Sequence, residues 1–129
     1  LPYLKKSSEP AIINIASISS FIAQPAFVPY NASKGALLQL TRCLAMDLAE
    51  YNIRVNCICP GTIETPALEH VIKLQGSDRK TFLQAGADSA LLKRLGKPKE
   101  VAYAVSFLAS SQASFITGAH LIVDGGATI

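Results

Sequence analysis

Three short apolar segments, separated by helical segments, constrain the fold of this chain more than any other feature. They cover residues 11–16, 53–58 and 120–124, and each is followed within three residues by a serine or a glycine. A strand buried on both faces reads as a nearly continuous apolar run, so the first segment predicts a buried strand of a parallel sheet. The order strand, helix, strand, helix, strand predicts an α/β fold in which right-handed crossovers connect parallel strands.

The longest helix is predicted from Pro29 to Tyr51, because a proline suits the first turn of a helix. Leucines and alanines form two apolar stripes along it, which indicates burial on more than one side. One side can cover the sheet, and the other could face either a partner subunit or the rest of the chain. Shorter helices are expected around 68–74, 79–85 and 99–110.

The composition fits a single well-packed domain over residues 1–129. Half of the residues are hydrophobic and 16% are charged, which leaves room for a real core. The net charge of +3 comes from scattered lysines and arginines, so nucleic acid is not an expected partner. No apolar run reaches the roughly 18 residues of a membrane span, so no membrane partner is expected. Three cysteines without metal-like spacing predict a metal-free protein in a reducing, intracellular and cytoplasmic setting.

A tyrosine and a lysine lie four residues apart, at Tyr30 and Lys34. Residues at this spacing share one face of a helix, about 5–6 Å apart at Cβ. An ammonium near a phenol favours the phenolate, so Tyr30 could exchange a proton with an alcohol or carbonyl oxygen at physiological pH. The simpler alternative is a packed tyrosine at a helix start with a solvated lysine one turn later.

Ser17 directly follows the first predicted strand and lies thirteen residues before Tyr30. Its hydroxyl is a candidate donor to the oxygen of a substrate, where it would stabilise developing charge. The alternative is a serine that caps the turn after the strand.

Five motifs occur together in one order along the chain: residues 14–17, 30–34, 54–56, 60–65 and 123–126. Together they resemble the short-chain dehydrogenase/reductase family, over the region from about Ile12 to the C-terminus. The resemblance implies the C-terminal half of a doubly wound, Rossmann-like sheet, with about three strands and flanking helices. It also suggests a structural role for Asn56 and for the turn at 124–126.

The resemblance further implies an NAD(P)-dependent short-chain alcohol dehydrogenase or carbonyl reductase. Such an enzyme transfers a hydride between a nicotinamide and an alcohol or ketone substrate. Tyr30 would donate or accept the proton, Ser17 would bind the substrate oxygen, and Lys34 would also bind the nicotinamide ribose. The loop after the second strand would hold the nicotinamide end of the cofactor, through Pro60, Gly61, the backbone of Ile63 and the hydroxyl of Thr65. The segment 66–97 would lie on the substrate side.

The first half of this family carries a glycine-rich turn that binds the cofactor pyrophosphate at a helix N-terminus. Neither this turn nor the residue that selects NAD or NADP occurs here, so both cofactors stay open. We interpret the chain as a fragment that is inactive by itself. Its first strand would lack one neighbour, and an open apolar edge predicts poor solubility.

The alternative is a short, catalytically silent oligomerisation module of the same fold. It would use the helix from Pro29 to Tyr51 as its interface. A homo-oligomer through this helix is expected on either interpretation.

Overall fold

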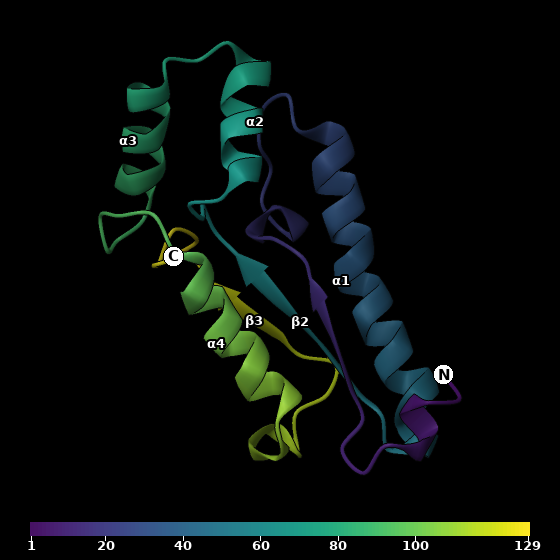
Figure 1. The fold of residues 1–129 in the computed structure, drawn as a ribbon. Helices are drawn as coiled ribbons and strands as arrows, with labels where there is room; N and C mark the ends of the chain where they lie inside the picture. Colours follow the sequence, from purple (N-terminus) through teal and green to yellow (C-terminus); the bar gives the residue numbers. More distant parts are fainter.

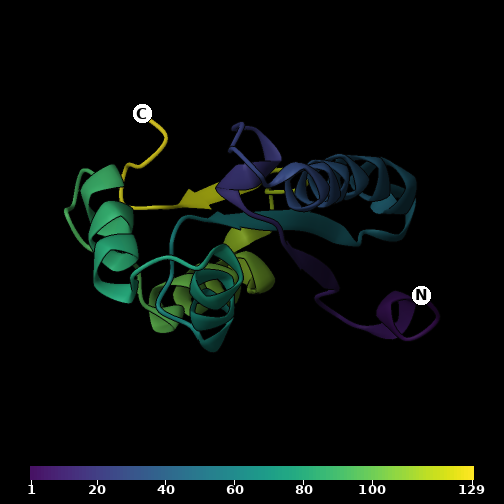
Figure 2. The ribbon, with the colours of Figure 1, turned by 90° about the horizontal axis from the view of Figure 1, so that it is seen from above.

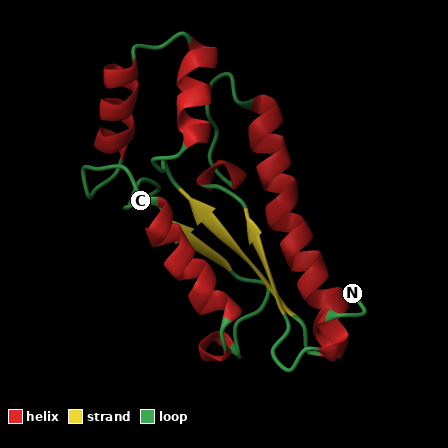
Figure 3. Ribbon diagram, viewed as in Figure 1, coloured by secondary structure: helices red, strands yellow, loops and turns green.

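The computed structural model describes all residues, 1–129, as a three-stranded parallel sheet with helices on both faces (Figures 1 and 3). The central strand β2 (Arg54–Pro60) pairs with β1 (Ala11–Ile15) on one side and with β3 (His120–Val123) on the other. The predicted parallel α/β architecture is therefore confirmed. The order β1-β2-β3 leaves β1 and β3 as edge strands.

The predicted helices are present, with somewhat different bounds. Helix α1 (Val28–Leu48) continues into a 3₁₀ turn at Ala49–Tyr51, and α4 covers Pro98–Ala109. Between them lie α2 (Pro66–Gln75) and α3 (Arg79–Ser89). A proline stands in the first turn of α1, α2 and α4, where its fixed φ suits the helix and its missing N–H costs nothing. None of the helices combines the length and the apolar character needed to cross a bilayer.

Alternate side chains of β2 point to opposite faces of the sheet and build two separate cores. Figure 2 shows α1 and α4 on these opposite faces. On the α1 side, Val55, Cys57 and Cys59 are fully buried and pack with residues that include Leu38, Ala45 and Leu48. On the α4 side, Ile58 packs with Leu108 and Ala113. Cys57 and Cys59, two residues apart in β2, therefore lie on the same face of the sheet.

Helix α1 covers the sheet with one side only. Leu38, Ala45 and Leu48 are buried against the sheet, whereas Leu40 is 48% exposed and Met46 is 81% exposed. The outer side of α1 therefore keeps apolar surface, and a subunit interface on that side stays a prediction.

Strand β1 is less buried than its apolar run predicted. Its residues are half-buried, and Ile15 is 45% exposed. The prediction of burial on both faces is wrong because β1 is an edge strand, with a partner strand on one side only. A continuous apolar run is typical of a strand that is covered on both faces. Within residues 1–129, β1 is only partly covered.

Asn56 joins β2 to the segment that leads into β3. Its side-chain amide donates to the carbonyl of Ile116 at 2.8 Å, and its side-chain oxygen accepts from the N–H of Ala119 at 3.0 Å. The residue is fully buried. These bonds explain the structural role that the motif suggested, because they fix β3 beside β2.

Replacing Asn56 with alanine should lower the free energy of unfolding by about 3 kcal/mol, since two buried backbone groups lose their partners. Urea denaturation of the full-length protein measures this change. Gln112→Ala is the matched control, because Gln112 is exposed and close in sequence to the same segment. Equal stability of the Asn56 and Gln112 variants would show that the two hydrogen bonds contribute nothing net.

Candidate active site

The carboxyl ends of β1 and β2 lie at the same edge of the sheet (Figure 1). The N–H of Ala16 donates to the carbonyl of Ile58 at 2.8 Å, which holds the chain leaving β1 beside the end of β2. Ser17 follows β1, and the loop 60–65 follows β2. Two of the segments singled out in the sequence therefore meet where open α/β sheets bind their ligands.

Ser17 both caps a turn and keeps a free donor. Its hydroxyl oxygen accepts from the N–H of Ser19 at 3.1 Å, at the start of the 3₁₀ turn Ile18–Ser20. The capping role considered as an alternative is thus real. A hydroxyl that accepts one hydrogen bond still has its own proton to donate, so the cap does not exclude the proposed contact with a substrate oxygen. Ser17 is only 8% exposed, which limits the access of water to its hydroxyl group.

Lys34 is held at the end of β1 by two hydrogen bonds. Its Nζ atom donates to the carbonyl of Ile15 at 2.9 Å. Its own carbonyl accepts from the hydroxyl of Ser20 at 2.8 Å, which docks the second turn of α1 on the 3₁₀ turn that Ser17 begins. An ammonium has three N–H donors, so two remain for other partners.

Tyr30 lies one helical turn before Lys34, at the open end of this arrangement. The Nζ atom of Lys34 is 5.6 Å from the centroid of its ring, and Phe27 packs edge-on against that ring. The side chain is 44% exposed, and its hydroxyl makes no hydrogen bond within the chain. The structure brings Tyr30 and Lys34 together and places Ser17 on the adjacent turn, with no direct bond between Ser17 and Tyr30.

A second tyrosine and lysine, Lys99 and Tyr103, show what distinguishes the first pair. They also lie four residues apart on a helix, and Nζ of Lys99 is again 5.6 Å from the ring centroid. Lys99 makes no hydrogen bond to the end of a strand, unlike Lys34, and the Tyr103 side chain is 61% exposed. The position of Lys34 relative to β1, and not the spacing alone, marks the candidate site.

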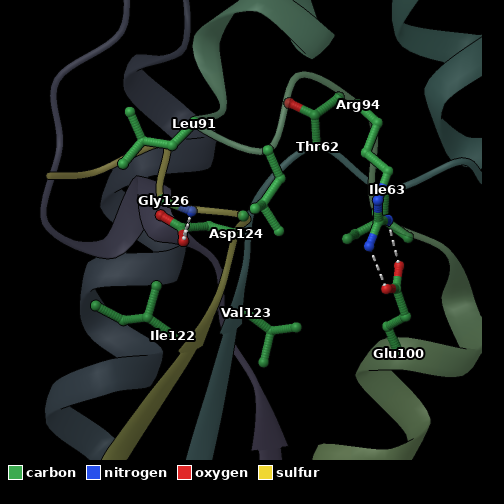
Figure 4. Close-up of a pocket in the computed structure, with 12 residues that line it drawn as sticks. Thr62, Ile63, Leu91, Arg94, Glu100, Ile122, Val123, Asp124 and Gly126 are labelled. Carbon is green, nitrogen blue, oxygen red and sulfur yellow. Dashed lines mark hydrogen bonds and ion pairs between the residues drawn. The ribbon is translucent and has the colours of Figure 1, made fainter.

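Gly61 packs against the turn that follows β3. Its N–H donates to the carbonyl of Val123 at 3.0 Å, and a Cβ atom at this position would lie 2.9 Å from the Cα atom of Asp124. The side chain of Asp124 in turn accepts from the N–H of Gly126 at 2.8 Å (Figure 4). The glycine is therefore required by the close approach of two strand ends, which fixes where the loop 60–65 begins.

Ile63 has a backbone donor and a backbone acceptor on the side of the loop away from Gly96. Gly96 lies beside it as a one-residue parallel bridge: its N–H donates to the carbonyl of Thr62 at 3.0 Å, and its carbonyl accepts from the N–H of Glu64 at 2.9 Å. In this pattern the N–H and the carbonyl of Ile63 itself point away from Gly96. Neither has a backbone partner in the chain, so one donor and one acceptor face outward together.

Thr65 and Pro60 complete the loop. Thr65 occupies the N-cap position of α2, but its side chain makes no capping bond, so its hydroxyl is available to a ligand. Pro60 is the last residue of β2. Three further residues beside this loop were not predicted from the sequence: Gly96, Arg94 and Glu100. The glycine that precedes α4 is the one sequence feature that points to this segment.

Beneath the site lie two buried thiols. The neighbouring Cys57 thiol, together with burial, raises the pKa of the Cys59 thiol and keeps it neutral. The N–H of Ser17 also lies against the sulfur of Cys59. Both thiols belong to the core that supports Ser17 and are fully closed to solvent.

The predicted substrate-side segment 66–97 folds as α2 and α3 and borders two hollows. A hollow of about 560 Å³ lies between the two helices and includes Thr65. One of about 470 Å³ lies between the loop at Thr62 and Ile63 and the end of β3 (Figure 4). Arg79 and Glu69 join α3 to α2 through an ion pair of 2.8 Å.

These features define the chain as a Rossmann-like α/β protein whose candidate site lies at the carboxyl edge of a parallel sheet. A family model described as enoyl-(acyl carrier protein) reductase matches residues 1–128. The chain therefore belongs to the short-chain dehydrogenase/reductase family, as its motifs predicted.

Individual relatives agree with this assignment. L-fucose dehydrogenase from Bos taurus is 44% identical over 129 residues, which are 100% of this chain and 47% of that protein. The ligand-free structure of Thermoplasma acidophilum aldohexose dehydrogenase superimposes with a TM-score of 0.91 at 41% identity, covering 98% of this chain and 51% of that one. The structure of 4-hydroxyisoleucine dehydrogenase complexed with NADH gives a TM-score of 0.86 at 35% identity, covering 98% and 50%. The chain thus spans about half the length of the curated relatives it matches.

Proposed function

We propose that this chain supplies the proton-transfer and nicotinamide-binding half of an NAD(P)-dependent alcohol dehydrogenase or carbonyl reductase. The observation that carries the proposal is the position of Lys34, whose ammonium is bonded to the end of β1 at 2.9 Å and lies 5.6 Å from the ring of Tyr30. Ser17 begins the turn on which this part of α1 docks. Tyr30, Lys34 and Ser17 thus lie on adjoining turns beside the end of β1, which supports the proposal.

The chemistry divides between the cofactor and the chain. When bound, the nicotinamide supplies or accepts the hydride. Tyr30 gives a proton to the carbonyl oxygen in reduction and takes one from the alcohol in oxidation. Lys34 stabilises the phenolate that reduction leaves behind, and its remaining N–H groups suit ribose hydroxyls. Ser17 donates to the substrate oxygen as negative charge develops there.

The loop 60–65 fits the carboxamide end of a nicotinamide. A primary carboxamide has N–H donors and a carbonyl acceptor, which match the outward-facing carbonyl and N–H of Ile63. The free hydroxyl of Thr65 adds a third polar group. NAD and NADP share this end of the molecule, so the fit applies to both.

The proposed substrates are small alcohols and their carbonyl products, and the segment 66–97 is the part of the chain that would contact them. The relatives are named for sugars and an amino-acid alcohol, which supports an alcohol-to-carbonyl reaction in this chain. We also propose that the exposed outer side of α1, which includes Leu40, forms a homo-oligomer interface.

The function is tested by nicotinamide-dependent turnover of the full-length protein with a panel of sugars, cyclic alcohols and hydroxylated amino acids. Ser17→Ala should lower kcat about 100-fold with little change in cofactor binding, because one donor to the developing oxyanion is lost. Ser33→Ala is the matched control, since the Ser33 hydroxyl donates to a carbonyl of its own helix at 2.7 Å.

Thermal melting of both variants separates catalysis from stability, because Ser17→Ala also removes the cap at Ser19. Full turnover by a folded Ser17→Ala protein would remove the serine from the mechanism. Absence of turnover with every substrate and both cofactors would contradict the proposed function itself.

A further inference from the structure

We propose that the segment from Arg94 to Glu100 positions the nicotinamide-binding loop, with Gly96 as the surface on which Ile63 rests and the Arg94–Glu100 ion pair as the clamp that holds Gly96 in place. This inference rests on the proposed function. It assigns a role to residues that contact neither the substrate nor the cofactor, so they are positioning residues.

Gly96 determines which way the backbone of Ile63 faces. Its two hydrogen bonds occupy the carbonyl of Thr62 and the N–H of Glu64, the groups on either side of Ile63. Because the groups before and after Ile63 are bonded on the Gly96 side, the N–H and the carbonyl of Ile63 face the opposite side. Without Gly96, nothing in the chain would hold the donor and acceptor of Ile63 outward together.

Gly96 is a glycine for steric reasons. A Cβ atom at this position would overlap the Cδ1 atom of Ile63. The φ of Gly96 does not lie in the left-handed region, so its backbone conformation does not by itself require glycine. The absence of a side chain lets the isoleucine lie directly on the backbone of the partner segment and so sets the depth of the loop.

The clamp ties this segment to the first turn of α4. Arg94 donates to the two carboxylate oxygens of Glu100 at 2.6 and 2.8 Å, and to the carbonyl of Leu95 at 3.1 Å (Figure 4). Glu100 also accepts from the N–H of Lys97 at 2.8 Å. Gly96 therefore lies inside a loop that is closed by hydrogen bonds at both ends.

The clamp stays ionised under ordinary assay conditions. The Arg94 guanidinium, followed by the N–H of Lys97, lowers the pKa of the Glu100 carboxyl to about 2. Both side chains are partly exposed, and exposed ion pairs contribute little to global stability. A change at Glu100 should therefore move the loop without unfolding the protein, which makes a positional role separable from a structural one.

The decisive variant is Gly96→Ala in the full-length protein. Its methyl group should push Ile63 aside and raise the KM for the nicotinamide cofactor about tenfold, with a smaller fall in kcat. Adding Ile63→Val removes the Cδ1 atom that the methyl group meets. The double variant should then return to the cofactor KM of Ile63→Val alone. A KM unchanged by Gly96→Ala, or a double variant as impaired as the single one, would overturn the proposal.

A second pair of variants tests the clamp, and this test can still be done if the Gly96→Ala protein does not fold. Glu100→Gln should raise the cofactor KM about threefold, without change in the substrate KM, because the charge-assisted bonds to Arg94 weaken. Glu69→Gln is the matched control, since it weakens a similar exposed ion pair with Arg79 that does not touch the loop. Equal cofactor KM values in the two variants would show that Glu100 merely caps α4.

The two proposals fail in different ways. If the parent protein turns over nicotinamide cofactors normally and the Gly96 and Glu100 variants behave like it, only the positioning role is contradicted. If the parent protein neither binds nor turns over these cofactors, both the proposed function and the positioning role are contradicted.

Discussion

Replacing Tyr30 with phenylalanine is expected to lower kcat of the full-length protein about 10³-fold while the cofactor dissociation constant stays within about twofold. The phenylalanine ring keeps the edge-on contact with Phe27 and lacks only the hydroxyl that would carry the proton. Steady-state kinetics and fluorescence titration with reduced cofactor measure the two quantities separately.

The chain contains its own control for this experiment. Tyr103 lies at the same distance from a lysine as Tyr30, but it is on α4 and 61% exposed, and its lysine is not bonded to the end of a strand. Tyr103→Phe should leave kcat unchanged. Near-normal turnover in the Tyr30 variant, or equal losses in the two variants, would end the assignment of proton transfer to Tyr30.

Replacing Lys34 with methionine is expected to lower kcat/KM for the cofactor by about 10³-fold or more, through both kcat and KM. Methionine keeps most of the side-chain volume but removes the bond to Ile15 and the cation beside Tyr30. Steady-state kinetics with varied cofactor concentration measure both effects.

Two control variants accompany this experiment: Lys34→Arg and Lys99→Met. Arginine retains the charge and a donor, so it should recover part of the activity, although its planar head group is a poor substitute for an ammonium. Lys99→Met should have no effect. A Lys34→Met protein that loses thermal stability but keeps its kinetics would reduce Lys34 to a structural tie between α1 and β1.

Local patterns were sufficient to predict most of the architecture. The strand at 53–58 and the helix at 29–51 each carry enough periodic apolar residues to specify their type, and Pro29 marks the start of that helix. Parallel pairing then brings Ser17 and the loop 60–65 to one edge without further information.

The remaining features depend on contacts between distant segments. The partial burial of β1 reflects the absence of a neighbour on one side, which its own sequence does not encode. The bridge between Ile63 and Gly96 joins residues 33 positions apart, and no local pattern pairs them. That the oxygen of Ser17 accepts from Ser19 while its own proton stays free is likewise visible only in the folded chain.

The one-residue bridge at Ile63 has a consequence for how specificity can evolve. Its outer face is a strand edge one residue long, and a planar amide is the smallest group that can complete such a ladder. Under the function proposed above, a nicotinamide amide would pair with these main-chain groups and not with the side chain. Other branched hydrocarbon side chains that still fit against Gly96 could then replace Ile63 without removing either hydrogen-bonding group.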